Sequence, residues 1–169
     1  SGLILTPKRS NLNLLNENEV ILWFEINKPT VVIIAAAKVG GILANSTNPY
    51  NFLLENLKIQ NNIIDSAFKN GVKRLLFLGS SWIYPKFAKQ PIKEDYLLTG
   101  KLESTNDAYA VAKIAGIKMC ESYNDQYKTN YKCLMPSNTF GPNDNYRNLV
   151  SHFIPSLIKK IHKMHKTKS

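Results

Sequence analysis

Long hydrophobic runs are absent from this chain of 169 residues, and so are several other features that mark particular protein classes. No apolar stretch reaches the roughly 18 residues that span a bilayer, and residues 1–9 are too short and too polar for a secretory signal. The two cysteines, Cys120 and Cys133, lack the spacing of a metal site. We find no repeat, low-complexity tract or interdomain linker. We therefore expect no membrane span, disulfide scaffold or metal centre, and a cytoplasmic location.

Acidic residues are too few to balance the basic ones, which leaves a net charge of +10. Much of this charge lies near the C-terminus, where five lysines alternate with His162 and His165. Cations are favourable at the C-terminal end of a helix, where they meet the negative pole of its dipole. The sequence has neither an aromatic RNA-binding signature nor a recognition-helix pattern. We therefore expect no nucleic-acid partner, and a solvated basic surface or a site for polyanionic small molecules.

Apolar runs rich in β-branched residues alternate with segments of helical spacing. The runs predict buried strands at residues 2–6, 31–37, 74–81 and 132–139, and a brief extended stretch is predicted at Leu12, Leu14 and Leu15. Helices are predicted at residues 16–29, 49–70, 107–127 and 149–165. Strands that alternate with helices indicate crossover connections, so the predicted class is α/β with a Rossmann-like, doubly wound parallel sheet.

One part of such a fold is missing from the sequence. A doubly wound dinucleotide-binding domain opens with a strand, a glycine-rich turn and a helix whose N-terminus holds a pyrophosphate. Gly40 and Gly41 follow the run at 31–37, but they do not form a GxxGxxG turn. The chain also begins with Ser1, directly at what would be the second strand. We therefore expect residues 1–169 to be a fragment: a partial cofactor domain that lacks its first βα unit and its glycine-rich loop.

The most informative combination of residues is Ser80, Tyr109 and Lys113. Tyr109 and Lys113 are four residues apart, which is about one helical turn and places them on the same helix face. Ser80 follows a buried strand at its carboxyl end, where open α/β sheets bind ligands. A lysine beside a tyrosine lowers the pKa of the phenol, which can then exchange a proton near neutral pH. We interpret these residues as a catalytic site in which Ser80 holds a carbonyl or alkoxide oxygen.

Four segments resemble the GDP-fucose synthase family, which belongs to the extended short-chain dehydrogenase/reductases. They are AAAKVGGILANSTNP (35–49), LLFLGSSWIYPKFAKQPI (75–92), NDAYAVAKIAGIKMCESYN (106–124) and NTFGPNDNY (138–146). The resemblance covers essentially the whole chain. It implies epimerisation of GDP-4-keto-6-deoxymannose and its NADPH-dependent reduction to GDP-L-fucose, in a full-length enzyme that is a homodimer.

The resemblance also implies roles for individual residues. Tyr109 would donate a proton to the C4 oxygen, Lys113 would hold the nicotinamide ribose, and His152 would act as acid and base in epimerisation. Arg9 matches an arginine that meets the adenosine 2′-phosphate, and Lys160 stands where the family has an arginine thought to contact the substrate pyrophosphate, in a substrate-binding region that begins at about 143–169. Cofactor contacts are implied at Arg9, Ala36, Leu78, Gly79, Ser80, Ser81, Tyr109, Lys113, Pro136, Ser137, Asn138, Thr139 and His152.

One departure from the family pattern leaves alternatives open. Trp82 stands where the family has the cysteine that works with the acid/base histidine, and an indole cannot take over proton transfer at carbon. The chain could therefore be an inactive relic or binding module. It could also belong to an epimerase or dehydratase that acts on another nucleotide sugar and uses NAD. Arg9 favours NADP over NAD.

Overall fold

The computed structural model describes residues 2–137, 139–144, 146, 151 and 153–166. A parallel sheet of three strands, in the order β1-β2-β3, forms its centre. The strands are β1 (Val31–Ile34), β2 (Arg74–Leu78) and β3 (Asn130–Leu134). The parallel α/β fold predicted from the alternating pattern is thus confirmed.

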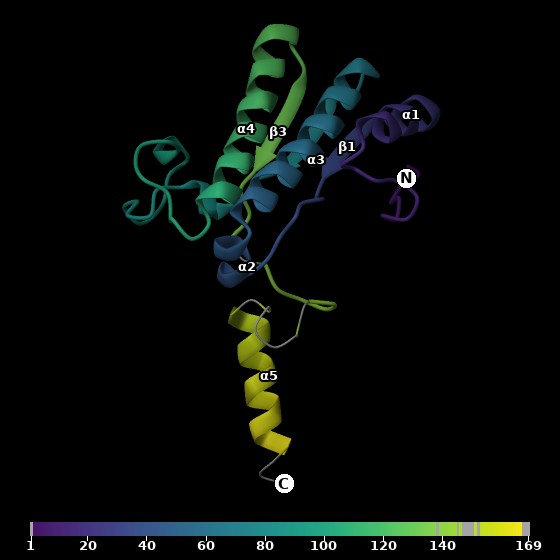
Figure 1. The fold of residues 1–169 in the computed structure, drawn as a ribbon. Helices are drawn as coiled ribbons and strands as arrows, with labels where there is room; N and C mark the ends of the chain where they lie inside the picture. The colour runs from purple at the N-terminus through teal and green to yellow at the C-terminus, as the bar shows by residue number, and fades with distance from the viewer. Residues whose placement is uncertain (1, 138, 145, 147–150, 152, 167–169) are drawn as a thin grey trace.

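Helices connect and follow these strands. They are α1 (Glu17–Asn27), α2 (Ile42–Thr47), α3 (Pro49–Lys69), α4 (Asp107–Tyr127) and α5 (Phe153–Lys166), with short 3₁₀ turns η1 (Ser81–Ile83) and η2 (Glu94–Tyr96). Figure 1 shows α3 and α4 side by side against the sheet, and α5 extending away from this layered body. Among the described helices, none is long and apolar enough to cross a membrane.

Local sequence signals explain where the helices begin and end. Asn16 caps α1, because its side chain accepts a hydrogen bond from the Glu19 amide at 3.3 Å and donates one to the Glu19 carboxylate at 3.0 Å. After α3, Gly71 adopts a positive φ of 73°, a conformation that glycine reaches without strain. These two signals, read from the sequence, set the helix boundaries that the structure has.

The core lies between the sheet and one layer of helices. Phe77 of β2 and Tyr131 of β3 are fully buried against Ile64 of α3 and Ile117 of α4. Successive right-handed crossovers that run in one direction across a sheet place their helices on the same face, so α3 and α4 share a face. The alternate strand residues point the other way, and Ile33 is 64% exposed. The burial of both sheet faces expected from the apolar runs is therefore not seen in the described residues.

Two of the predicted extended segments do not form. Residues 2–8 have no regular structure and are exposed, and Leu12, Leu14 and Leu15 lie in turns and coil. A strand needs a neighbouring strand for its backbone hydrogen bonds, and no described strand pairs with residues 2–6. Leu12 nevertheless packs into the core, with only 6% of its surface exposed. The prediction of a strand at residues 2–6 was therefore wrong for this structure.

Candidate active site

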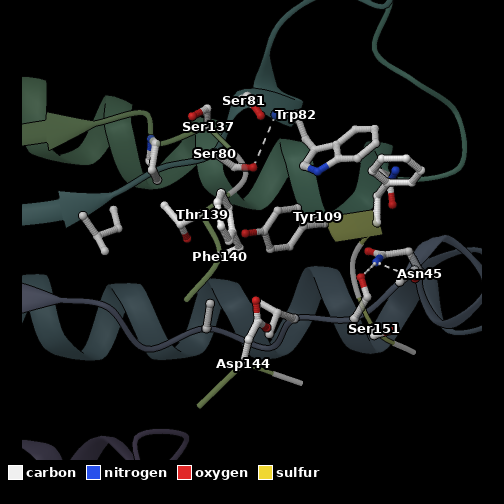
Figure 2. A pocket seen from close by; sticks show the side chains of 18 of the residues that line it. Asn45, Ser80, Ser81, Trp82, Tyr109, Ser137, Thr139, Phe140, Asp144 and Ser151 are labelled. Carbon is white, nitrogen blue, oxygen red and sulfur yellow. Dashed lines mark hydrogen bonds between the residues drawn. The ribbon is translucent and has the colours of Figure 1, made fainter. Parts of the chain in front are cut away.

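A cavity of about 930 Å³ lies at the carboxyl ends of the three strands. Each strand is shorter than predicted, and the residues that follow β1, β2 and β3 leave the sheet and form the cavity wall. Asn106, which precedes α4, and Tyr109 and Lys113 in its first turns line the same space, and α2 closes another side. Figure 2 shows Ser80, Tyr109 and Thr139 around this cavity. This is the place where open parallel sheets bind ligands.

Tyr109 and Lys113 enter the cavity from one face of α4, as their spacing predicts. The Lys113 ammonium donates a hydrogen bond of 2.8 Å to the carbonyl oxygen of Leu78, at the end of β2. It lies 5.9 Å from the centre of the Tyr109 ring and 4.7 Å from that of Phe77. Lys113 is only 4% exposed, and among the described residues no carboxylate forms an ion pair with it. The cavity wall thus holds a buried positive charge.

Burial changes the acidity of both groups. It lowers the pKa of Lys113 from 10.5 to about 8, because the charged form is poorly solvated. It raises the pKa of Tyr109 above 10.0, although a hydrogen bond with Ser80 acts in the opposite direction. The sequence led us to expect that Lys113 lowers the pKa of Tyr109. Instead, burial raises the pKa of Tyr109, and the ammonium donates its hydrogen bond to the Leu78 carbonyl.

Ser80 and Trp82 occupy the turn that follows β2. Ser80 is buried and caps η1, because its hydroxyl oxygen accepts a hydrogen bond of 3.3 Å from the backbone amide of Trp82. The indole of Trp82 lines the cavity and is 38% exposed. The turn therefore presents a hydroxyl and a large aromatic ring to the same space (Figure 2).

The structure brings most of the residues named from the sequence to this one cavity. Those that line it are Leu78, Gly79, Ser80, Ser81, Tyr109, Lys113, Pro136, Ser137 and Thr139. Ala36 does not line it, although its neighbours Ala35 and Ala37 do.

Of the four other residues named from the sequence, two lie away from the cavity and two cannot be placed relative to it. Arg9 lies in an exposed turn near the N-terminus, and Lys160 lies on the exposed surface of α5. Neither of these two lines the cavity. Asn138 and His152 fall outside the described residues.

Several cavity residues had not been identified from the sequence. Asn45 of α2 is 6% exposed and donates hydrogen bonds to the carbonyls of Gly40 and Gly41 at 2.9 and 3.2 Å. Its side-chain oxygen is buried, with no hydrogen-bond partner among the described residues. Asn106, Phe140, Asp144 and Ser151 also line the cavity. The one available signal was the Gly40–Gly41 pair, because it directly follows a predicted strand end.

Comparison with known proteins places the chain in a family. Residues 4–168 match the NAD dependent epimerase/dehydratase family. The chain is 51% identical over 159 residues to GDP-L-fucose synthase of Sinorhizobium fredii, a match that covers 94% of this chain and 51% of that protein. It is 53% identical over 154 residues to GDP-L-fucose synthase of Escherichia coli, covering 91% and 48%. The chain thus spans about half the length of the curated relatives that it matches.

Solved structures agree in fold. The GDP-mannoheptose C4 reductase of Campylobacter jejuni with NADP bound has a TM-score of 0.88 at 42% identity, covering 94% of this chain and 47% of that one. The GDP-L-fucose synthetase of Naegleria fowleri bound to NADP has a TM-score of 0.86 at 29% identity, covering 98% and 54%. The family match covers nearly the whole chain, and the chain has a cavity at the strand ends, where such sheets bind ligands. The chain therefore belongs to the NAD dependent epimerase/dehydratase family.

Proposed function

We propose that this chain supplies the ketone-reducing site of an NADP-dependent enzyme that converts GDP-4-keto-6-deoxymannose to GDP-L-fucose. The observation that carries the proposal is the joint placement of Ser80, Tyr109 and Lys113 in one cavity at the strand ends. The similarity to GDP-L-fucose synthases at 51–53% identity supports the choice of substrate.

The cavity wall suits the nicotinamide and ribose end of NADP(H). Lys113 offers a buried cation, and Ser80, Ser81, Ser137 and Thr139 offer hydroxyls for ribose and amide groups. The buried, unpartnered oxygen of Asn45 offers an acceptor in the same wall. We propose that NADPH, which supplies a hydride when bound, lies along the residues after β2 and β3. By resemblance, the proposed contacts extend to Ala36, Asn138 and His152, and Arg9 would meet the 2′-phosphate.

Tyr109 is suited to donate the proton that the reduced carbonyl oxygen requires. The raised pKa keeps its phenol protonated at neutral pH, which is the form needed for donation. Ser80, whose hydroxyl acts to lower the pKa of Tyr109 and lines the same cavity, would hold the keto oxygen beside the phenol. With a pKa of about 8, the Lys113 ammonium is largely charged at neutral pH, and its charge would stabilise negative charge that develops at the oxygen or at Tyr109.

The chain has fewer of the residues needed for epimerisation than of those needed for reduction. His152 is proposed as one acid/base group, by resemblance to the family. Its partner in the family is a cysteine, and Trp82 stands at that place. The N–H of an indole is not acidic enough to give up its proton near neutral pH, so Trp82 cannot transfer a proton to or from a sugar carbon. We therefore propose that reduction is the step that the chain's own residues support best.

Two other functions remain as alternatives. An inactive binding module would keep the cavity but show no turnover, and Trp82 is the residue that favours it. A family member that acts on another nucleotide sugar would also keep the serine, tyrosine and lysine. The fold of a UDP-glucose 4-epimerase from Thermotoga maritima matches this chain with a TM-score of 0.74 at 19% identity, a likeness of fold alone.

We further propose an arrangement for the whole enzyme. Residues 1–169 would form a partial cofactor domain, with the substrate-binding region beginning at about 143–169 and Lys160 near the substrate pyrophosphate. The enzyme would be a cytoplasmic homodimer that joins through helices equivalent to α3 and α4. In support, Leu53, Leu54 and Leu57 of α3 are only half-buried. Sedimentation of the purified protein tests the dimer.

The decisive experiment measures NADPH consumption with GDP-4-keto-6-deoxymannose and identifies the product. The protein is taken in the longest form that its coding region supplies. We expect oxidation of NADPH and formation of a 6-deoxyhexose product, both slowed by about 10²–10⁴-fold in Tyr109→Phe. Turnover with a UDP-sugar instead would establish the other nucleotide-sugar function. Binding of NADPH without turnover of either substrate would establish the binding module.

A further inference from the structure

Trp82 is a large aromatic residue that the proposed proton chemistry does not use. The other tryptophan, Trp23 of α1, packs against the hydrophobic core. Trp82 lies outside that core, and 38% of its surface is exposed. Its ring borders the cavity of about 930 Å³ and also a smaller one of about 320 Å³. The exposed part of this side chain faces these cavities and is available to a ligand.

The backbone around Trp82 is held in place although more than a third of the residue's surface is exposed. The Trp82 amide donates a hydrogen bond of 3.3 Å to the Ser80 hydroxyl, and the residue lies in the middle of the η1 turn. Figure 2 shows the indole on the cavity wall near Tyr109, with its ring nitrogen turned toward the interior. Among the described residues, no group accepts a hydrogen bond from this N–H. The cavity thus receives an apolar ring face and an unpartnered donor from one side chain.

The chemistry of these two features identifies the part of a ligand that would meet them. A flat indole packs against another flat or apolar surface, and a sugar ring offers such a surface on its C–H face. The indole N–H needs an acceptor, and sugar oxygens supply it. Trp82 lies two residues after Ser80, so a ring whose carbonyl is held by Ser80 and Tyr109 lies beside the indole. The adenine and ribose of a dinucleotide would lie farther along the strand ends.

We propose that Trp82 is a sugar-binding residue: its indole packs on the hexose ring of the nucleotide sugar and its N–H donates a hydrogen bond to a sugar oxygen. This assignment rests on the proposed function and specifies how its substrate is held. It gives Trp82 a role in binding that does not depend on proton transfer.

The test compares the binding of GDP-L-fucose, GDP and NADPH, each measured separately by calorimetry. The two guanine nucleotides differ only by the sugar, so the ratio of their dissociation constants isolates the sugar contribution. Trp82→Ala removes both the ring and the donor, and should weaken GDP-L-fucose binding by about 10-fold while leaving GDP and NADPH unchanged. Trp82→Phe keeps an aromatic ring face but removes the N–H donor, and should weaken GDP-L-fucose binding by about 3-fold.

Fluorescence gives a second readout that is independent of affinity. In Trp23→Phe, Trp82 is the one tryptophan left among residues 1–169, and its emission should change on addition of GDP-L-fucose more than on addition of GDP. The assignment would be overturned if Trp82→Ala weakened the binding of GDP and of GDP-L-fucose equally, or weakened the binding of NADPH alone. It would also be overturned if the emission of Trp82 did not change when GDP-L-fucose is bound. If the wild-type protein binds neither NADPH nor GDP-L-fucose, the proposed function itself fails.

Discussion

Replacing Lys113 with methionine removes a buried ammonium with little change in side-chain volume, and its effect on stability depends on pH. Burial lowers the pKa of Lys113 from 10.5 to about 8 in the folded protein. Between these two pH values the unfolded chain binds the proton while the folded chain has released it. The free energy of unfolding of the wild-type protein therefore rises with pH across this window. One pKa unit corresponds to about 1.4 kcal/mol, so the full rise is about 3 kcal/mol.

The assay is urea unfolding, followed by tryptophan fluorescence, at a series of pH values from neutral to the pKa of free lysine. The quantity to plot is the difference in the free energy of unfolding between wild type and Lys113→Met. The free energy of unfolding of the wild type should rise relative to that of Lys113→Met as pH rises, because the methionine variant has no proton to release. The lost hydrogen bond to Leu78 shifts the variant's stability at all pH values, so it leaves the slope unchanged.

Lys118→Met on the same helix is the matched control. Lys118 is exposed and forms an ion pair with Glu121 at 2.8 Å, and exposed pairs contribute little to stability. We expect its difference curve to be flat across the window. A flat curve for Lys113→Met as well would contradict the burial of an unpaired ammonium in the cavity wall. A slope of the opposite sign would indicate that a carboxylate stabilises the charged form.

Two further changes test other parts of the structure. Gly116→Ala would place a methyl group 2.6 Å from the ring of Phe77 and 2.9 Å from the side-chain oxygen of Gln60. We expect it to lower the free energy of unfolding by about 1–3 kcal/mol, visible in a denaturation curve, and an unchanged curve would show that α4 does not pack this closely on β2. Trp82→Cys should raise solvent deuterium incorporation at C3 and C5 of the keto sugar at saturating substrate, by up to about 10²–10⁴-fold. No gain would count against the assignment of position 82 to the epimerisation pair.

Several elements could be predicted from the sequence because their signals are local. The predicted helix at residues 107–127 coincides with α4, whose buried positions include Ala110, Lys113 and Ile117, at helical spacing. Asn16 and Gly71 marked helix ends because capping depends on only a few neighbouring residues. The convergence of Ser80, Tyr109 and Lys113 followed from the rule that strand ends and helix starts share one rim of a parallel sheet.

Other features depend on partners that are distant in the sequence. Residues 2–6 have a strand-like composition, but a strand forms only where another strand accepts its hydrogen bonds. Continuous apolar runs predicted that both sheet faces are buried, yet Ile33 is exposed because α3 and α4 share one face. The pKa of Tyr109 is raised because the fold buries the phenol, and the Lys113 ammonium hydrogen-bonds the distant Leu78 carbonyl. Asn45 reaches the cavity through the fold of residues 40–45, for which no sequence motif was recognised.

The measurement that tests the central claim most directly is single-turnover reduction by Tyr109→Phe. The substitution removes the phenolic hydroxyl and keeps the ring, so the cavity shape and the contact with Lys113 are preserved. With GDP-4-keto-6-deoxymannose and NADPH both saturating, we predict that reduction slows by about 10²–10⁴-fold while the dissociation constant for NADPH is unchanged. Reduction at the wild-type rate in Tyr109→Phe would contradict the assignment of Tyr109 as the proton donor, and with it the proposed active site.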